Sequence, residues 1–256
     1  MKSKGNRNDR FSDDKIGFGF RQVRPELHES LVRDVFDSVA QRYDLMNDIM
    51  SIGLHRRWKA TLLDRLIPRQ NQTLLDVAGG TGDIADGFLK RGGSNAILCD
   101  FSEQMLQAGI DRALNHGRIV SQNRVCGEAA TLPIKSMSVD ACTIVFGLRN
   151  ITRRRAALKE MWRTLKPGGH FLCLEFSPSV LPHLRPAYDA YSFKVLPWLG
   201  QHMAGDRDSY QYLAESIREF PGPDRISDEM RAAGFGNITQ NPMTGGIVWL
   251  HSGWRV

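Results

Sequence analysis

Short apolar segments alternate with amphipathic segments from residue 73 to residue 176, and this alternation constrains the fold more than any other feature of the sequence. Four apolar runs predict strands, at 73–77, 96–99, 139–146 and 170–176. The spacing of apolar residues between them predicts intervening helices, including 102–115 and 152–166. Such an alternation builds βαβ units, so we expect a parallel sheet with helices on both of its faces.

The segments outside this core have other patterns. Helices are expected over 27–43, 55–66 and 224–233, and a weak strand at 118–120 or 124–126. The final stretches, 235–241 and 247–255, are separated by a short turn and predict an antiparallel hairpin at the sheet edge.

The chain divides into three parts on this pattern. Residues 1–26 are polar, and we expect them to form a flexible, irregular segment. Residues 27–256 are expected to form one domain. Within it, residues 177–221 are helical in pattern but interrupted by prolines, which indicates a helical insert.

A glycine-rich turn follows the first strand of the core, with the sequence Asp76-Val77-Ala78-Gly79-Gly80-Thr81-Gly82-Asp83. Glycines such as Gly80 and Gly82 adopt positive φ and let the backbone approach a ligand. Asp100 ends the next strand, where a carboxylate can accept hydrogen bonds from both hydroxyls of a ribose. Because ligands of open parallel sheets bind beyond the carboxyl ends of the strands, we expect Asp76, Gly80, Gly82 and Asp100 to bind a nucleoside.

The same turn argues against a dinucleotide. Its glycines do not follow the G-x-G-x-x-G spacing, and Asp83 and Asp86 at the start of the next helix would repel a diphosphate. A ligand with a ribose, a cationic centre and no phosphate fits better, and S-adenosylmethionine is such a ligand. The alternative is a turn that only connects a strand to a helix.

A third strand end carries Glu128 and Ala129, within the segment Gly127-Glu128-Ala129-Ala130-Thr131-Leu132-Pro133. An acidic side chain and free backbone groups at this place suit contact with an adenine. The alternative is that Glu128 only caps a short helix in the loop.

Composition excludes several classes of protein. The 256 residues are 41% hydrophobic and 24% charged, which is typical of a globular domain. Lys and Arg number 34 against 28 Asp and Glu, a formal charge of +6, but no long basic tract is present, so we expect no nucleic-acid partner. No run of 18 apolar residues and no secretory signal are present, so we expect a cytoplasmic protein with four reduced core cysteines and no metal site.

Long strings of sequence outside the glycine turn resemble one enzyme family. They are Gly17–Phe20, Val35–Ala40, Tyr43–Asp48, Ser51–Trp58, Phe146–Asn150, Arg163–Gly169, Leu174–Ser177, Tyr188–Phe193, Asp208–Tyr210 and Tyr212–Arg218. With the turn at Asp76–Asp83, they resemble the class I methyltransferase superfamily and, more closely, the UbiE-type C-methyltransferases of ubiquinone and menaquinone biosynthesis. The resemblance runs from about Gly17 to the C-terminus.

The resemblance implies a Rossmann-like fold with a central, mostly parallel, seven-stranded sheet, an antiparallel edge strand, N-terminal helices and a helical insert. It implies S-adenosylmethionine as cofactor and a polyprenyl quinol as substrate, either demethylmenaquinol, 2-methoxy-6-polyprenyl-1,4-benzoquinol or both. Cofactor contacts carry over to Thr81, Asp100, Glu128 and Ala129. The family often has Ser where this chain has Val145.

Methyl transfer to a ring carbon also implies catalytic groups, because a quinol carbon is a weak nucleophile until a ring hydroxyl is deprotonated. Arg149, beside Asn150, is expected to stabilise the quinolate, since a guanidinium stays protonated and cannot act as the base. Tyr43 and Asp44 are candidates to orient the hydroxyl or to accept its proton. The alternatives are a surface salt bridge for Arg149, helix-helix packing for Tyr43 and a helix cap for Asp44.

We expect the substrate to bind at the helical insert. Four of the five tyrosines lie between residues 188 and 212, and we expect Tyr188, Tyr191 and Tyr210 to surround a hydroxylated aromatic head group. The apolar residues among them suit the first isoprenes or a membrane interface, which makes peripheral attachment to the inner face of the membrane an expectation. The alternative is a packed subdomain or dimer face, and a homodimer, a quinone-biosynthesis complex and a different phenolic or lipid-like acceptor all stay open.

Overall fold

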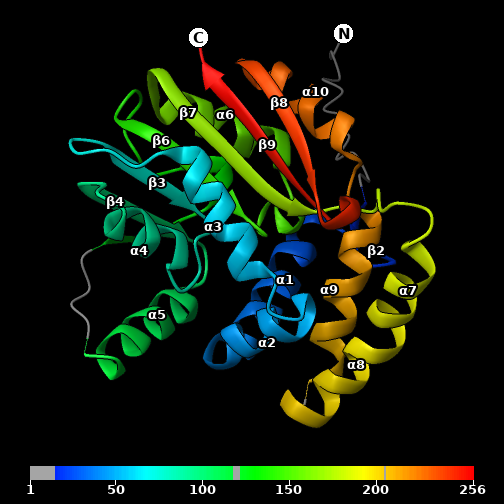
Figure 1. Cartoon of the computed structure of the whole chain (residues 1–256). Coiled ribbons are helices and arrows are strands. Elements are labelled where there is room, and N and C mark those ends of the chain that lie inside the picture. The colour runs from blue at the N-terminus through cyan, green and yellow to red at the C-terminus, as the bar shows by residue number, and fades with distance from the viewer. Residues whose placement is uncertain (1–14, 118–121, 205) are drawn as a thin grey trace, which may run out of the picture.

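The computed structural model describes residues 15–117, 122–204 and 206–256. Its centre is a seven-stranded sheet in the order β5-β4-β3-β6-β7-β9-β8. The strands are β3 (Thr73–Val77), β4 (Asn95–Asp100), β5 (Asn123–Cys126), β6 (Val139–Val145), β7 (Leu165–Phe176), β8 (Phe235–Met243) and β9 (Val248–Arg255). The expected mostly parallel sheet is therefore confirmed (Figure 1).

The first strand of the sheet along the chain, β3, lies in its middle, and later strands are added on both sides of it. The chain first runs outward from β3 to β4 and β5, and it then returns to the other side of β3 to form β6 and β7. Neighbouring strands whose crossovers leave in opposite directions open a crevice at their carboxyl ends. The ends of β3 and β6 lie at this switch point, which is where the predicted nucleoside site should be.

Two hydrophobic cores cover the two faces of the sheet. Side chains alternate along β3, so that Leu74 packs into one core and Leu75 into the other. The first core includes residues of α3 (His55–Leu66), α4 (Asp83–Lys90) and α5 (Glu103–Asn115), and the second includes residues of α6 (Arg154–Thr164) and α10 (Pro223–Ala233). Figure 1 shows α3 in front of the sheet and α6 behind it.

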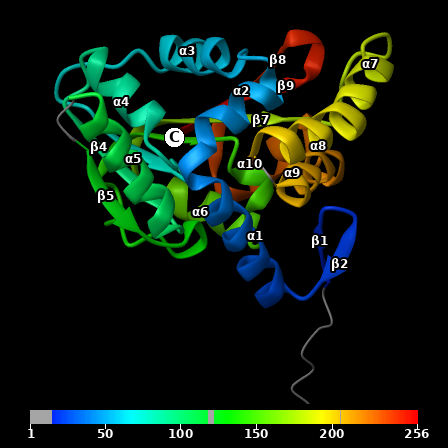
Figure 2. The ribbon, with the colours of Figure 1, turned by 90° about the horizontal axis from the view of Figure 1, so that it is seen from below.

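The remaining elements gather beyond the carboxyl ends of the parallel strands. They are the hairpin of β1 (Ile16–Phe18) and β2 (Arg21–Val23), the helices α1 (Pro25–Val39) and α2 (Tyr43–Ser51), and the insert helices α7 (Arg185–Ala190), α8 (Leu196–Leu199) and α9 (Arg207–Glu219). Figure 2 shows α1 and α2 beside α8 and α9. The Tyr191 hydroxyl donates a hydrogen bond to the Ile49 carbonyl, which joins the insert to α2.

Three details differ from the sequence-based expectations. Residues 1–26 were expected to be irregular, but Ile16–Val23 form a hairpin whose Phe18 ring stacks on Tyr212 with ring centroids 4.2 Å apart. The strand that runs against its neighbours is β9, which lies one position in from the edge, so the edge strand β8 is parallel to β7. Cys126 is exposed, whereas the other three free cysteines are buried.

Most of the other strand and helix expectations agree with the structure, but the helix expected over 152–166 ends at Thr164, and the strand expected at 170–176 already begins at Leu165. The predicted strand 73–77 and helix 55–66 have the observed bounds. Of the two alternatives for the weak strand, 124–126 falls in β5, and 118–120 lies outside the described residues. The helix expected over 27–43 ends at Val39, and a short 3-10 turn, Ala40–Arg42, leads into α2.

Gly109 packs α5 directly against the glycine turn, and this contact predicts a stability effect. A β-carbon at this position would lie 2.4 Å from the Thr81 carbonyl oxygen, which is backbone and cannot move aside. We expect Gly109→Ala to lower the free energy of unfolding by at least about 1 kcal/mol, although alanine favours a helix over glycine by about 1 kcal/mol. Urea unfolding measures this, with the exposed α5 substitution Gln104→Ala as control; a stabilised Gly109→Ala variant would contradict the packing.

Candidate active site

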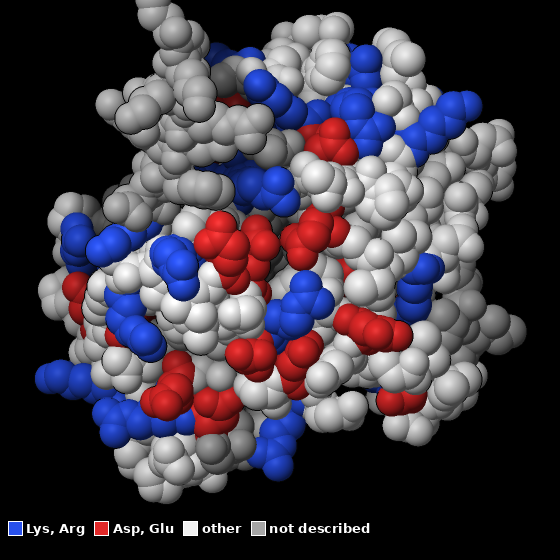
Figure 3. Space-filling model, turned by 180° about the vertical axis from the view of Figure 1, so that it is seen from behind, with Lys and Arg blue, Asp and Glu red and all other residues white. Residues whose placement is uncertain are grey.

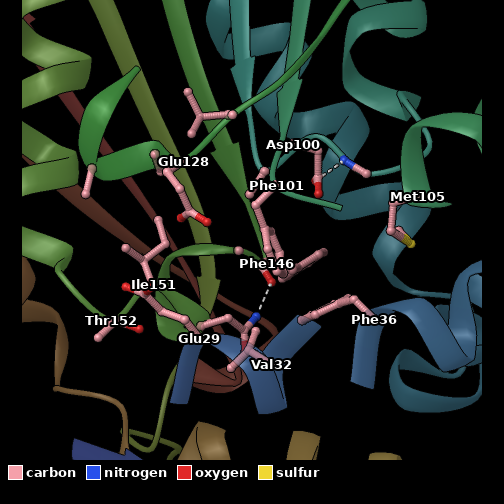
Figure 4. Close-up of a pocket in the computed structure, with 18 of the residues that line it drawn as sticks. Glu29, Val32, Phe36, Asp100, Phe101, Met105, Glu128, Phe146, Ile151 and Thr152 are labelled. Carbon is pink, nitrogen blue, oxygen red and sulfur yellow. Dashed lines mark hydrogen bonds between the residues drawn. The ribbon is translucent and has the colours of Figure 1, made fainter. Parts of the chain in front are cut away.

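A pocket opens where β3 and β6 end side by side. Its volume is about 780 Å³ including the part open to solvent, and we call it the large pocket (Figure 4). Ala78 and Phe146, directly after the two strands, both have left-handed backbone, with φ of +51° and +58°. Positive φ values are unfavourable for residues other than glycine, and such residues are often found at functional sites. Here they turn the chain sharply away at each strand end, which leaves the crevice open.

Asp100 lies at the floor of the large pocket, at the end of β4. Its Oδ2 accepts a hydrogen bond from the Gly80 N–H at 2.8 Å, and its Oδ1 accepts one from the Ser102 N–H at 3.0 Å. Burial raises the pKa of Asp100 to about 6, although the backbone donors oppose the rise. An ionised carboxylate has about four acceptor positions, so two remain for the hydroxyls of a ligand. The structure thus brings the predicted Asp100 and Gly80 together in one pocket.

Asp76 lies beneath the glycine turn. The Thr143 hydroxyl donates to its Oδ1 at 2.7 Å, whereas its Oδ2 is buried and has no hydrogen-bond partner among the described residues. Burial raises the pKa of Asp76 to about 7. A β-carbon on Gly79 would lie 2.0 Å from Leu98 and 2.8 Å from Asp76 Oδ2, so only glycine fits there.

The other predicted cofactor residues are divided between two places. Glu128 and Ala129 line the large pocket. Thr81 lines a smaller neighbouring cavity instead, and Gly82, with φ of +95°, begins α4. Gly82 lies outside both sets of lining residues in the described part of the chain.

The large pocket is acidic. Glu29, Asp100 and Glu128 line it, and Arg153 is the one Lys or Arg among its described lining residues. Acidic side chains also gather near the centre of the face shown in Figure 3, with basic side chains spread around them. This charge favours a cationic ligand over a phosphorylated one.

Arg149 lies beside the pocket in a buried ion pair. Its Nη1 is 2.9 Å from Glu175 Oε1, and the side chains of the two residues are 3% and 2% exposed. Nη1 also donates to the Phe146 carbonyl, and Nε donates to the Ser216 hydroxyl at 3.3 Å. The guanidinium therefore holds the turn after β6, and its predicted contact with a quinolate stays a prediction.

Asn150 is the predicted catalytic residue that borders the pocket from this turn. The Tyr212 hydroxyl donates to its Oδ1 at 3.0 Å, and its Nδ2 lies 3.5 Å from the Phe146 carbonyl. These contacts fix the orientation of the amide. The sequence alone does not identify Tyr212 as a site residue, because only the fold brings this part of α9 to the end of β6.

Tyr43 and Asp44 occupy different environments although they are neighbours in sequence. Tyr43 lines the large pocket, and burial raises the pKa of its phenol, with the Lys59 ammonium opposing the rise. Asp44 does not line this pocket in the described structure, and both of its oxygens accept hydrogen bonds from Arg112, at 2.8 and 2.9 Å.

The three predicted substrate tyrosines lie away from the large pocket in the described part of the chain. The Tyr188 ring lies 4.9 Å from the Arg218 guanidinium carbon, Tyr191 bonds to the Ile49 carbonyl, and Tyr210 is 1% exposed. Aromatic residues pack helices together as readily as they bind ligands, so composition alone could not separate the two roles. Their role in substrate binding stays a prediction.

The apolar wall of the pocket was not identified from sequence. It comes from α1 and from the turn after β6, with Val32, Phe36, Phe146 and Ile151 on it. Thr152 also lines this side, and its hydroxyl lies 2.8 Å from Nδ1 of the buried His28. Helical periodicity could show that Val32 and Phe36 are inward-facing, but it could not distinguish a core from a pocket wall.

Known proteins resemble this chain over nearly its whole length. The model of the ubiE/COQ5 methyltransferase family matches residues 24–255. The ubiquinone/menaquinone biosynthesis C-methyltransferase UbiE of Nitrobacter hamburgensis is 51% identical over 95% of this chain and 98% of its own. The protein of the same name from Acidiphilium cryptum is 46% identical over 96% of this chain and 98% of its own.

Solved structures support the fold at much lower identity. A putative methyltransferase of Haloferax volcanii, solved with its activator Trm112, has a TM-score of 0.63 and 18% identity over 88% of this chain and 97% of its own. A methyltransferase of Thermotoga maritima, named as dependent on S-adenosylmethionine, has a TM-score of 0.61 and 19% identity over 88% of this chain and 100% of its own. The expected fold class is thereby confirmed, and the sequence relatives establish that the chain belongs to the ubiE/COQ5 methyltransferase family.

Proposed function

We propose that the chain transfers the methyl group of S-adenosylmethionine to a ring carbon of a polyprenyl quinol in ubiquinone or menaquinone biosynthesis. The acceptor is demethylmenaquinol, 2-methoxy-6-polyprenyl-1,4-benzoquinol or both. The observation that carries the proposal is the acidic pocket around Asp100, in a chain about half identical to relatives named for this reaction. When bound, S-adenosylmethionine supplies an electrophilic methyl group on a cationic sulfur.

The residues of the large pocket fit this cofactor. Asp100 retains acceptor positions for ribose hydroxyls, and Glu128 and Ala129 offer an acidic side chain and backbone groups for the adenine. The acidic lining favours the positive charge of the sulfonium and disfavours phosphate. Gly80, which lines the pocket, lets the backbone of the turn approach the cofactor without a side chain between them.

The opposite side of the pocket fits a quinol ring. Val32, Phe36 and Ile151 provide an apolar wall, and Asn150 and Thr152 add polar groups able to bond a ring hydroxyl. Asn150 is held in place by Tyr212, and the turn that carries it is held by the Arg149–Glu175 pair. Rigid positioning of the ring carbon matters because methyl transfer needs carbon, methyl and sulfur in line, with reacting atoms roughly 3 Å apart.

A patch of exposed aromatic and apolar residues suits attachment to a membrane that contains the quinol. We define the aromatic patch as Phe20 in the β1–β2 turn with Phe193, Val195 and Trp198 in the insert. The Phe20 and Phe193 ring centroids lie 6.0 Å apart, which joins the hairpin to the insert. Figure 2 shows the hairpin and α7–α8 at the same end of the molecule.

Basic residues border the aromatic patch. Arg21, Arg24 and Lys194 are exposed beside it. Aromatic rings bordered by positive charge suit the interface of an anionic phospholipid bilayer. No helix in the described ranges is long and apolar enough to cross a membrane. We propose that the attachment through the aromatic patch is peripheral, at the inner face of the membrane.

Removal of the Asp100 carboxylate tests the cofactor site. We expect Asp100→Ala to weaken binding of S-adenosylhomocysteine, the demethylated product, by roughly 100-fold, since two hydrogen bonds to a charged group are lost.

The affinity of the wild type for S-adenosylhomocysteine should also depend on pH. It should fall about tenfold per pH unit below pH 6, because protonation of Asp100 removes an acceptor. Calorimetry measures both effects, with the exposed Glu103→Ala as control. Unchanged affinity in Asp100→Ala, or an unchanged pH profile, would remove Asp100 from the site.

Substitutions in the Arg149–Glu175 ion pair test the role of Arg149 in stability and turnover. Arg149→Met leaves Glu175 buried without its partner, and we expect the free energy of unfolding to fall by about 3–5 kcal/mol. The double variant Arg149→Met with Glu175→Gln should regain stability while its turnover on quinol stays roughly 100-fold low, because the turn carrying Asn150 is no longer held. Wild-type turnover in the stable double variant would exclude both a catalytic and a positioning role.

The aromatic patch predicts vesicle binding. We expect the wild type to sediment with vesicles containing about one quarter anionic phospholipid, and a Phe193→Ser, Trp198→Ser variant to lose most of this binding. Leu114→Ser, an exposed site on α5, is the matched control. Equal sedimentation of all three proteins would contradict attachment through the patch.

A further inference from the structure

A buried histidine lies directly behind the Thr152 hydroxyl of the large pocket. His28, from α1, is 2% exposed, and its Nδ1 lies 2.8 Å from Thr152 Oγ1. Thr152 is half-buried and lines the pocket on the side away from Asp100 (Figure 4). His28 is not itself among the described residues that line the pocket. A molecule in the pocket can therefore reach the imidazole through the Thr152 hydroxyl.

The β1–β2 hairpin holds the imidazole in this position. The Phe18 ring meets His28 edge-on, with ring centroids 6.1 Å apart, and its face stacks on Tyr212. Tyr212 in turn donates to Asn150. The same aromatic packing thus supports the partners of two polar residues, Asn150 and Thr152, that line the large pocket.

The imidazole is neutral at pH 7 and can accept a proton. Burial lowers the pKa of His28 below its ordinary value of 6.5. Its Nε2 has no hydrogen-bond partner among the described residues, so Thr152 is the partner that the structure gives to the ring. A threonine hydroxyl has one donor and two acceptor positions. Thr152 can therefore donate to Nδ1 while it accepts from a hydroxyl group in the pocket.

The charged groups on the elements packed around His28 are exposed or pair with other residues. Arg21, Arg24 and Glu26 are exposed. The others are Arg149 with Glu175, Arg153 with Glu29, and Glu215, which accepts a hydrogen bond from the Phe20 N–H. Burial is therefore what lowers the pKa of His28, and no charge among the described residues opposes it.

The other candidate proton acceptors near the pocket are less well placed. Asp100 lies on the opposite side and accepts from two backbone N–H groups. Glu29 has 41% of its side chain exposed to water. Tyr43 is a phenol whose pKa is raised by burial, so it is already protonated at neutral pH, and Asp44 is bonded to Arg112. The Thr152–His28 pair is the neutral base with a hydrogen-bonded path to the apolar side of the pocket.

We propose that Thr152 and His28 form a relay that takes the hydroxyl proton of the quinol. This inference rests on the proposed function. Thr152 Oγ1 accepts the proton of the ring hydroxyl while its own proton moves to His28 Nδ1, which leaves a quinolate in the pocket and an imidazolium behind it. The released electron pair forms the bond from the ring carbon to the methyl group, and the carbon–sulfur bond breaks with its pair left on sulfur.

The relay also returns a proton at the end of the reaction. The methylated ring carbon loses its hydrogen to water as a proton, and the imidazolium proton passes back through Thr152 to the ring oxygen. One proton is released in all, which balances the loss of the sulfonium charge. Since the pKa of a phenol is about 10 and that of imidazole about 6.5, we expect the first proton transfer to accompany formation of the carbon–methyl bond.

His28→Gln tests the relay, because glutamine can accept a hydrogen bond from Thr152 but cannot take its proton. We expect kcat on quinol at saturating S-adenosylmethionine to fall roughly 100-fold, with the affinity for S-adenosylhomocysteine changed less than about twofold. Glu26→Gln, exposed on the same helix, is the control. Unchanged kcat in His28→Gln beside an active wild type would overturn the relay. A wild type inactive on every quinol would instead refute the proposed function.

The pH profile of kcat separates proton transfer from a structural role. Wild-type kcat should fall with decreasing pH, with a midpoint below pH 6.5, because protonated His28 cannot accept a proton. Saturating S-adenosylmethionine keeps the protonation of Asp100, which weakens binding, out of this profile. The decrease should be absent in His28→Gln, and its persistence there would contradict the relay.

Thr152→Val provides a second test that stands even if His28→Gln does not fold. Valine has the shape of threonine without the hydroxyl, so we expect the same loss of kcat and the same loss of the acid limb. The double variant should be no slower than either single variant, because each breaks the same path. Losses that multiply in the double variant, or wild-type kcat in Thr152→Val, would overturn the proposal.

Discussion

The hydrogen bond from the Gly80 N–H to the Asp100 carboxylate joins the two segments that form the cofactor site, the glycine turn after β3 and the end of β4. This bond fixes the turn in its place above the sheet. The second oxygen of Asp100 fixes the start of α5 through Ser102. Burial of a carboxylate costs free energy unless its oxygens accept hydrogen bonds. Here backbone N–H groups occupy some of the acceptor positions of Asp100, and the other positions are open to a ligand.

Charge distinguishes this site from other sites on similar folds. A glycine turn after the first strand of an open sheet serves phosphate binding in many proteins, with the helix N-terminus attracting the anion. In this chain Asp83 occupies the first turn of α4, and Asp100, Glu29 and Glu128 surround the pocket. The same architecture therefore selects a cationic nucleoside, while Lys59 and Arg112 balance Asp83 beside it.

Sequence predicted the parts of the fold and site that depend on local pattern. The strand and turn from Thr73 to Asp83, with Asp100 at the next strand end, followed from apolar runs, glycines and one carboxylate. What it missed depends on contacts between distant segments. The β1–β2 hairpin rests on Phe18 stacking against Tyr212, and the role of Tyr212 rests on its bond to Asn150. Tyr188 and Tyr210 are predicted to bind the substrate only because tyrosines are concentrated in the insert. Such a concentration does not distinguish a packed ring from a ligand-binding one.

The central claim is that the ring carbon of a quinol receives the methyl group of a cofactor held over the ends of β3 and β4. Incubation of the protein with methyl-labelled S-adenosylmethionine and a panel of extracted polyprenyl quinols, followed by mass analysis of the products, tests it most directly. We expect label on a ring carbon of a benzoquinol, a naphthoquinol or both. Label on a hydroxyl oxygen, or on none of the quinols, would contradict it.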